Sequence, residues 1–445
     1  MKISNASCLG IAFVTALAGM LPAAVPGDAR AARGGGAEVA ALEPELEALY
    51  KDLHQHPELG FHETRTSAEL ATRVRALGYE VTTGIAKTGL VAILRNGPGP
   101  TVMLRTELDA LPIEEKTGLP FASKVTTTDA AGVVVPVAHA CGHDLHMTAW
   151  FGTAKVMAQR RSRWHGTLML VAQPAEELGN GAAAMLADGL FTRFPKPDFA
   201  IGMHDEPTMP AGLVGYHAGY FRATVDTVEI LIYGRGGHGA RPQTTVDPIV
   251  IAARSILGIQ TIVSRETDPL TPVVISIGAI HGGTAANIIP DQVRMLVTVR
   301  TYDQKVRDHI LAALKREVDG EAAAADAPTP PSVKVLESAD AVYNDPALTA
   351  RVAAALHREL GASSAQEMPQ QMTSEDFSQY GRAGVPAVLL HIGAVDPAAL
   401  ASGRSIPGVH SPYWAPELEP TLRSMVAAEV VMLTDLLNTP NRKAP

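Results

Sequence analysis

Cysteine is scarce in this sequence, because Cys8 and Cys141 are the only two among 445 residues. Cys8 lies in an N-terminal segment with the features of a removable leader, so Cys141 would be the only thiol of the mature chain. A single thiol excludes an intrachain disulfide. It also disfavours a redox or zinc-storage role, because such proteins normally use a second thiol. An exported protein would keep a lone cysteine only if it were protected, and binding to a metal ion would protect it.

The sequence also lacks an excess of positive charge and a long apolar run. Its 37 Lys and Arg against 46 Asp and Glu give a net charge of −9, which argues against a nucleic-acid partner. The apolar run from Cys8 to Leu21 is shorter than the roughly 20 residues that cross a membrane. Lys2 before it and Ala29-Arg30-Ala31 after it are typical of a secretory signal peptide. We therefore expect removal of residues 1–31, export to the periplasm or medium and no stable membrane insertion, with an uncleaved anchor as the alternative.

The length of the chain predicts more than one domain, because a domain typically has about 100–200 residues. Strands and helices alternate over residues 38–222, which predicts an α/β domain with a mostly parallel sheet. A strand-helix-strand-strand-helix pattern follows over residues 223–331 and ends in an Ala- and Pro-rich linker at 321–331. The α/β pattern resumes over residues 332–445. An insertion inside a split domain is the simplest account.

Four segments carry side chains that suit a transition-metal ion. Cys141 and His143 lie two apart in a Gly-containing turn, and Glu176-Glu177 follow an apolar strand. His204 ends a second apolar strand, and His410 lies in a Gly-Val-His-Ser-Pro loop. Thiolate, imidazole and carboxylate together favour a zinc-like metal over calcium or magnesium. Each segment alone is also compatible with a buried cysteine, a surface histidine or a solvated acidic helix start. Their shared position at strand ends favours one site.

The two adjacent carboxylates predict two different roles, one in metal binding and one in proton transfer. Neighbouring residues in an extended segment point in different directions, so one can bind metal while the other faces a bound water. This gives Glu177 as a ligand and Glu176 as a general base. Such an arrangement suits hydrolysis in which a metal lowers the pKa of water and a carboxylate moves the proton.

Ordered motifs run from about His54 to Pro412. They include His139-Ala140-Cys141-Gly142-His143-Asp144, Ser374-Glu375-Asp376-Phe377 and segments 56–61, 108–112, 173–177, 236–238, 246–248, 281–285, 287–290, 299–301 and 410–412. In this order they resemble the aminoacylase/carboxypeptidase metallohydrolases, in the branch of hippurate hydrolase and the plant indoleacetyl-amino acid hydrolases. So many motifs in one order make a chance match improbable.

The resemblance implies a fold and a metal centre. It implies an α/β fold with a split zinc-peptidase-like catalytic domain at residues 38–222 and 332–445. An inserted ferredoxin-like lid and dimerisation domain is expected at residues 223–331. Two divalent transition-metal ions (zinc, manganese, nickel or cobalt) would share Cys141 as a bridge. The implied metal ligands are Cys141, His143, Glu177, His204 and His410.

The resemblance also implies roles around the ions. Glu176 matches the general base. His238 matches a lid histidine that reaches the partner's active site in dimeric relatives and stabilises the oxyanion. Asn287 and Arg300 match lid positions linked to binding of the substrate carboxylate. Asp109 is expected to orient a metal ligand from outside the centre. A homodimer or higher homo-oligomer is therefore expected.

Four positions depart from the pattern of the branch. Glu107 stands where Asp is usual, and Leu145 replaces a usual Gly. Asp205-Glu206 follow His204, where relatives often carry apolar or aromatic residues. The acidic pair is interpreted either as a solvated loop or as a sign of preference for a basic amino acid moiety.

The expected function is metal-dependent hydrolysis of the amide bond of N-acyl amino acids, hippurate-like or related. The products would be a carboxylic acid and a free amino acid. A dipeptidase or carboxypeptidase that uses the same site on small peptides is the alternative enzyme. A binding module that has lost activity is a third possibility, against which Glu176 and the full ligand set argue.

Overall fold

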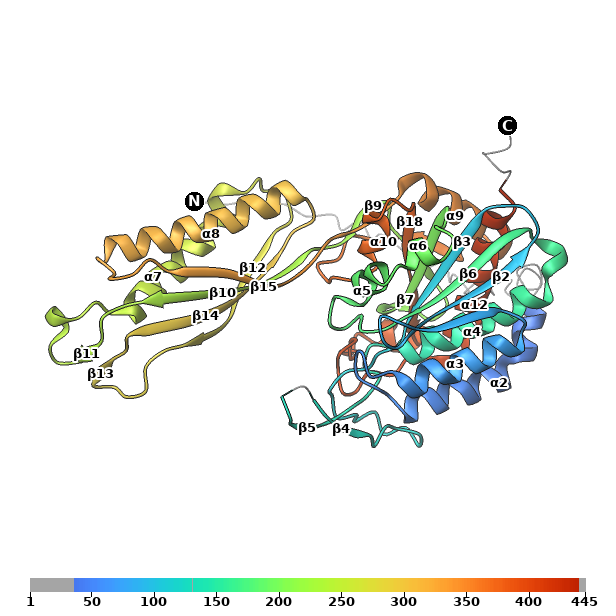
Figure 1. Cartoon of the computed structure of the whole chain (residues 1–445), viewed down its shortest axis with the longest axis horizontal. Coiled ribbons are helices and arrows are strands. Elements are labelled where there is room, and N and C mark those ends of the chain that lie inside the picture. The colour runs from blue at the N-terminus through green and yellow to red at the C-terminus, as the bar shows by residue number, and fades with distance from the viewer. Residues whose placement is uncertain (1–35, 130, 440–445) are drawn as a thin grey trace, which may run out of the picture.

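The computed structural model describes residues 36–129 and 131–439, so the predicted signal peptide at 1–31 lies outside the described residues. The larger of its two units is built around an eight-stranded sheet (Figure 1). Four neighbouring strands, β6, β3, β7 and β18, run parallel in its centre. In sheet order the strands are β1 (Glu80–Ile85), β2 (Gly89–Asn96), β6 (Gly166–Gln173), β3 (Thr101–Glu107), β7 (Phe199–Pro210), β18 (Ala387–Val395), β8 (Val214–Tyr216) and β17 (Ala365–Glu367).

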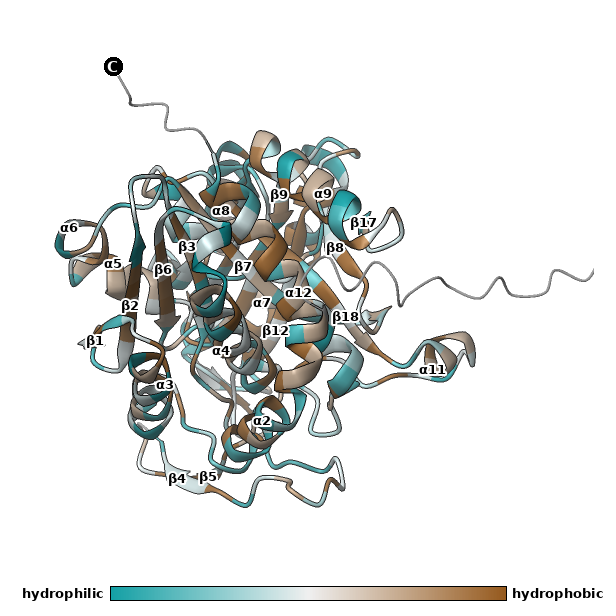
Figure 2. Cartoon of the chain, turned by 90° about the vertical axis from the view of Figure 1, so that its right-hand side faces the viewer, coloured by the Kyte–Doolittle hydropathy of each residue, from teal (hydrophilic) through white to brown (hydrophobic). Residues whose placement is uncertain are grey.

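Helices cover both faces of this sheet because its strands are apolar on both sides. Along β2, Leu90 and Ala92 belong to the core on one face, and Val91 and Ile93 to the core on the other. The first face packs against α2 (Gly36–Gln55), α3 (Thr64–Ala76), α4 (His143–Gln159), α9 (Pro346–Leu360) and α12 (Leu418–Leu437). The second packs against α5 (Gly181–Ala187), α6 (Leu190–Arg193) and α10 (Ser378–Arg382). The central strands are accordingly hydrophobic (Figure 2).

The smaller unit is an antiparallel sheet of order β12-β14-β10-β15 with two helices on one face. In chain order it contains β10 (Val225–Tyr233), α7 (Pro248–Thr261), β12 (Val274–His281), β14 (Gln292–Arg300), α8 (Gln304–Ala324) and β15 (Ser332–Ala339). Buried and half-buried residues alternate along β10, so Val228, Ile230 and Ile232 face the helices. This βαββαβ order is the ferredoxin-like arrangement that was predicted.

The boundary of the smaller unit lies later than predicted. The expected linker at 321–331 is partly helical, because α8 continues to Ala324 through an alanine-rich stretch with high helix propensity. The following strand, β15, begins at Ser332 and pairs with β10. Residues 332–339 therefore belong to the small sheet and not to the catalytic unit.

Short elements join and extend the two units. Strands β9 (Gly219–Arg222) and β16 (Val342–Asn344) pair where the chain leaves and re-enters the larger unit. The far end of the small unit carries the pair β11 (Gly237–His238) and β13 (Ile288–Ile289) (Figure 1). The remaining elements are β4 (Thr126–Thr128), β5 (Val134–Pro136), α11 (Pro397–Ala401), the 3₁₀ turns Arg161–Arg163 and Pro242–Thr244, and a π-helical turn Ile262–Glu266. Within residues 36–129 and 131–439, no helix is long and apolar enough to cross a membrane.

Candidate metal centre and catalytic cavity

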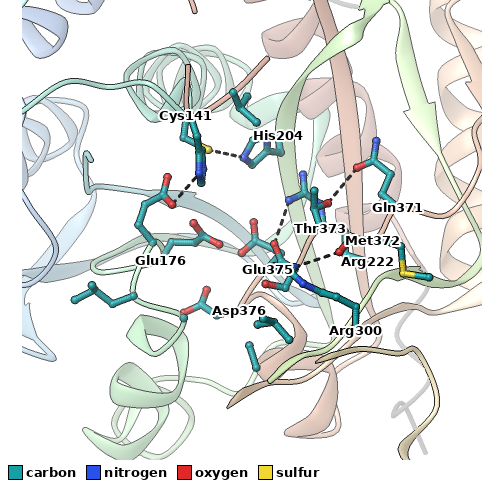
Figure 3. Close-up of a pocket in the computed structure, with 18 of the residues that line it drawn as sticks. Cys141, Glu176, His204, Arg222, Arg300, Gln371, Met372, Thr373, Glu375 and Asp376 are labelled. Carbon is teal, nitrogen blue, oxygen red and sulfur yellow. Dashed lines mark hydrogen bonds and ion pairs between the residues drawn. The ribbon is translucent and has the colours of Figure 1, made fainter. Parts of the chain in front are cut away.

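A cavity of about 650 Å³ opens beside the carboxyl ends of the central strands, between the two units. This is the edge where sites of open α/β sheets gather. Its walls include Cys141, Glu176 and His204 from the larger unit and Arg300 from the smaller one (Figure 3). His410 of the larger unit also lines it. The sequence therefore brings segments separated by more than 200 residues to one place.

The turn before α4 aims Cys141 and His143 in a common direction. Gly142 between them has a left-handed backbone (φ 75°) and caps the helix. A Cβ at this position would lie 2.7 Å from the carboxylate carbon of Asp205, so only glycine fits without a shift. The Cys141 Sγ consequently lies 3.4 Å from Nε2 of His204.

The five predicted ligands converge. Donor atoms of Cys141, His143 and His204 lie within 4.8 Å of one another, and so do those of Cys141, Glu177 and His410. The two groups are linked, because Nε2 of His143 is 3.9 Å from Oε1 of Glu177. On the far side, Nε2 of His410 is 3.3 Å from Oε2 of Glu177. Two donor groups that share one sulfur suit two ions bridged by a thiolate.

Hydrogen bonds direct the ligand atoms of two histidines inward. Nδ1 of His143 donates to the backbone oxygen of Asp109 at 2.8 Å, and Nδ1 of His204 donates to that of Asp205 at 2.8 Å. The Nε2 lone pairs therefore point into the centre. Among the described residues, Nε2 of His143 and Oε1 of Glu177 are buried without a hydrogen-bond partner. A cation would satisfy both atoms, so the residues present fit a metal centre.

Asp109 holds the two glutamates in place. Its carboxylate accepts the backbone N–H of Glu176 at 3.0 Å and that of Glu177 at 2.9 Å. Ala175, just before them, has a left-handed backbone (φ 51°), as does His410 (φ 65°). Such conformations in residues other than glycine are costly and persist where the surroundings fix them. Asp109 thus orients His143 through its carbonyl and both glutamates through its carboxylate.

Burial and neighbouring charges shift the pKa values of Glu176 and Cys141. Burial, together with the charges of Glu375 and Glu177, raises the pKa of Glu176 well above its usual value. A raised pKa in a carboxyl group that lines a cavity is typical of a proton shuttle. Burial and the nearby carboxylates also raise the pKa of the Cys141 thiol. A bound divalent cation would oppose this and hold the sulfur as a thiolate.

Two predicted site residues lie elsewhere in the same chain. His238 and Asn287 are exposed neighbours at the far end of the small unit, where the N–H of Gly239 donates to the carbonyl of Asn287 at 2.8 Å. Neither residue lines the cavity. Arg300 does line it, and its Nη1 donates to the carbonyl of Met372 at 3.2 Å.

The interpretation of Asp205 and Glu206 as a solvated loop is wrong. Both are buried on β7, with 1% and 4% of their surface exposed. The carboxylate of Asp205 accepts a hydrogen bond from Nε1 of Trp414 at 2.9 Å, and its backbone N–H donates to Nε2 of His146 at 2.9 Å. Glu206 accepts one from Nδ1 of His391 at 2.9 Å. Because protein donors occupy both carboxylates, the geometry also argues against a preference for basic substrates based on this pair.

A buried charged network behind the cavity was not foreseen. Arg105 is fully buried on β3, and its Nη2 donates to Glu375 at 2.8 Å and to Asp376 at 3.0 Å. Glu107 contacts Arg105 and accepts from Nδ1 of His146 at 3.1 Å. Glu107, which stands where the resembled branch usually has Asp, is therefore part of this network. Two charged residues at the end of an otherwise apolar strand were the signal in the sequence.

The fold and the site together define a dinuclear metal-dependent hydrolase of amide or peptide bonds. Residues 103–423 match the model of peptidase family M20/M25/M40, and the chain belongs to this family.

Three relatives place the chain within the family. N-acetylcysteine deacetylase of Bacillus subtilis is 38% identical over 285 residues, which cover 64% of this chain and 72% of that protein. Hippurate hydrolase of Campylobacter jejuni is 40% identical over 271 residues, covering 61% and 68%. The crystal structure of a B. subtilis dinuclear metal-binding M20 peptidase superposes with a TM-score of 0.72 at 31% identity, covering 88% and 98%. The predicted hippurate hydrolase branch is confirmed.

Proposed function

We propose that this protein hydrolyses the amide bond of N-acyl amino acids and releases a carboxylic acid and a free amino acid. The observation that carries the proposal is the convergence of two donor groups, which share Cys141, beside the buried carboxyl group of Glu176. Relatives named for deacetylation of N-acetylcysteine and for hydrolysis of hippurate support this substrate class. The ligand set suits zinc, manganese, nickel or cobalt.

Three side chains at or beside the cavity have separate tasks in this reaction. When bound, the two ions would polarise the amide carbonyl and lower the pKa of a water molecule. Glu176 accepts the proton of the attacking water and passes it to the leaving amine. Asp109 holds Glu176 and Glu177 in position because its carboxylate accepts hydrogen bonds from their backbone N–H groups. Arg300 binds the carboxylate of the substrate from the smaller unit.

We further propose that His238 and Asn287 serve the cavity of a second copy. Their position at the far end of the small unit keeps them away from the cavity of their own chain (Figure 1). In a homodimer that places this end beside the partner's cavity, His238 would stabilise the oxyanion of the tetrahedral intermediate.

Metal analysis and a substrate screen test the proposal together. The purified protein is expected to contain two transition-metal ions per chain and to cleave members of an N-acyl amino acid panel. Glu176→Gln should lower kcat by about 10²–10⁴-fold with unchanged metal content, the usual range for loss of a general acid-base group. Near-normal turnover of this variant would refute the role of Glu176. Faster cleavage of free dipeptides than of acylated amino acids would assign the site to a dipeptidase instead.

A further inference from the structure

Two arginine side chains line the same cavity without a direct ion pair among the residues that the structure describes. Arg222 ends β9 and is only 7% exposed, and Arg300 ends β14 and is half-buried. In the part of the chain that the structure describes, neither guanidinium has a carboxylate oxygen within 4.0 Å. Buried cations are normally paired, so two such groups facing one cavity point to an anionic ligand.

Shared contacts place the two guanidiniums on one wall. Nη1 of Arg300 donates to the carbonyl of Met372 at 3.2 Å, and Nη1 of Arg222 donates to that of Ser374 at 3.3 Å. These carbonyls are two residues apart in one loop. Figure 3 shows both arginines on the side of the cavity opposite Cys141 and Glu176. A substrate between the two walls would meet the catalytic groups at one end and the arginines at the other.

A hydrogen-bonded relay fixes the orientation of Arg222. Its Nη2 and Nε donate to Nε2 of His391, at 2.8 and 3.2 Å. Nδ1 of His391 donates in turn to Glu206 at 2.9 Å. A ring that accepts at Nε2 and donates at Nδ1 is neutral. The charge of Glu206 therefore offsets that of Arg222 across a neutral histidine, whereas no carboxylate among the described residues pairs with Arg300.

We propose that Arg222 and Arg300 together bind one carboxylate on the amine half of the substrate, with Arg222 held in place by His391 and Glu206. The inference rests on the proposed function and adds Arg222 as a substrate-positioning residue. One carboxylate balances the uncompensated charge of Arg300, and both guanidiniums still have N–H donors free for its two oxygens. The site then requires a free carboxylate next to the scissile amide, so amides and esters of the same substrates are poor.

The test compares hippurate with its uncharged analogue hippuramide. The metal-loaded enzyme should prefer the acid by at least about 100-fold in kcat/KM. Arg222→Met should lower kcat/KM for the acid by about 10–100-fold, mainly through KM, and change the value for the amide less than about threefold, as expected for loss of a charge-assisted hydrogen bond. Arg222→Lys should retain part of the preference, because it keeps the charge and loses the fork. Arg294→Met, which removes an ion pair with Glu229 on β14 outside the cavity, is the matched control.

Binding separates this proposal from the assignment of the reaction. Calorimetry with the same acid and amide reports the preference even if neither is hydrolysed, and Arg300→Met gives a second variant if Arg222→Met does not fold. Because both arginines would hold the same carboxylate, the losses of the two single variants should not add in the double variant. Equal binding of acid and amide by the wild-type enzyme would overturn the proposal. An equal loss for acid and amide in Arg222→Met would also overturn it and leave that residue a structural role.

Discussion

Single atoms decide how many ions the centre can hold. The Cys141 sulfur belongs to both donor groups, whereas His410 belongs to one. We expect Cys141→Ala to lower the metal content from about two ions per chain to below one, and His410→Ala to retain about one, because metal affinity depends on ligand number. Elemental analysis of the two variants after dialysis measures this difference. Equal metal content in both variants would show that the sulfur is not shared.

Substitution of Gly142 by alanine adds only one methyl group but should disturb the metal centre strongly. An alanine there meets both the left-handed backbone and the Asp205 carboxylate at 2.7 Å. Gly97 has a similar φ of 82°, and a Cβ added there would have no neighbour within 4 Å, so Gly97→Ala carries the backbone strain alone. We expect Gly97→Ala to cost about 1 kcal/mol of unfolding free energy and Gly142→Ala about 2–4 kcal/mol, with weaker metal binding. Denaturant titrations that gave equal costs would contradict the steric argument.

At the scale of elements, the contact between α4 and α12 contains a buried acid. Glu429 on α12 is 2% exposed, and the hydroxyl of Thr153 on α4 donates to it at 2.6 Å. Burial raises the pKa of Glu429 to about 8, although the hydrogen bond from Thr153 acts in the opposite direction. The folded protein therefore keeps Glu429 protonated at neutral pH.

This acid should make stability fall as the pH rises. An unfolded glutamate titrates near its ordinary pKa of about 4.3, so between that pH and about 8 the folded state binds more protons and loses stability with increasing pH. Glu429→Gln removes this dependence, and we expect it to be more stable than the wild type by about 4–5 kcal/mol at pH 8.5 and similar to it at pH 4.5. Chemical denaturation at the two pH values measures the difference. A constant difference across this range would exclude titration of Glu429 as its cause.

The elements differ in how far local sequence could define them. β3, β6 and β10 coincide with apolar or alternating runs that can be recognised in the local sequence. The end of α8 and the membership of β15 could not be read in this way. Helix propensity continues through the alanines up to Ala324, and strand pairing with β10 is a long-range contact.

The residues of the site also differ in whether local sequence or only the folded structure reveals them. Motifs predicted the five candidate metal ligands and Glu176, because their residue types carry the chemistry, and the structure brings these side chains together. The relay of Arg222, His391 and Glu206 joins three separate strands and leaves no local pattern in the sequence. It could be found only after folding had brought β9, β18 and β7 together.

At the scale of the whole molecule, the distance between His238 and the cavity predicts complementation between chains. In the proposed homodimer, Glu176→Gln and His238→Ala should each be nearly inactive when a variant chain pairs with a copy of itself. After dissociation and reassembly of an equal mixture, half of the dimers would carry both variants, and each would have one intact site. We expect roughly a quarter of the wild-type activity, as random pairing in a two-fold symmetric dimer requires. A mixture no more active than its components would place the function of His238 within its own chain or exclude it.

The donors of the centre are spread along the chain from Cys141 to His410, with the entire small unit translated between them. A ribosome that has released three quarters of the polypeptide has not yet supplied His410, so no nascent fragment can complete the pair of donor groups. Capture of the second ion, for which His410 is needed, must therefore follow synthesis. The ions available in the compartment where the finished chain folds, and not those around the ribosome, will determine which metal completes the centre.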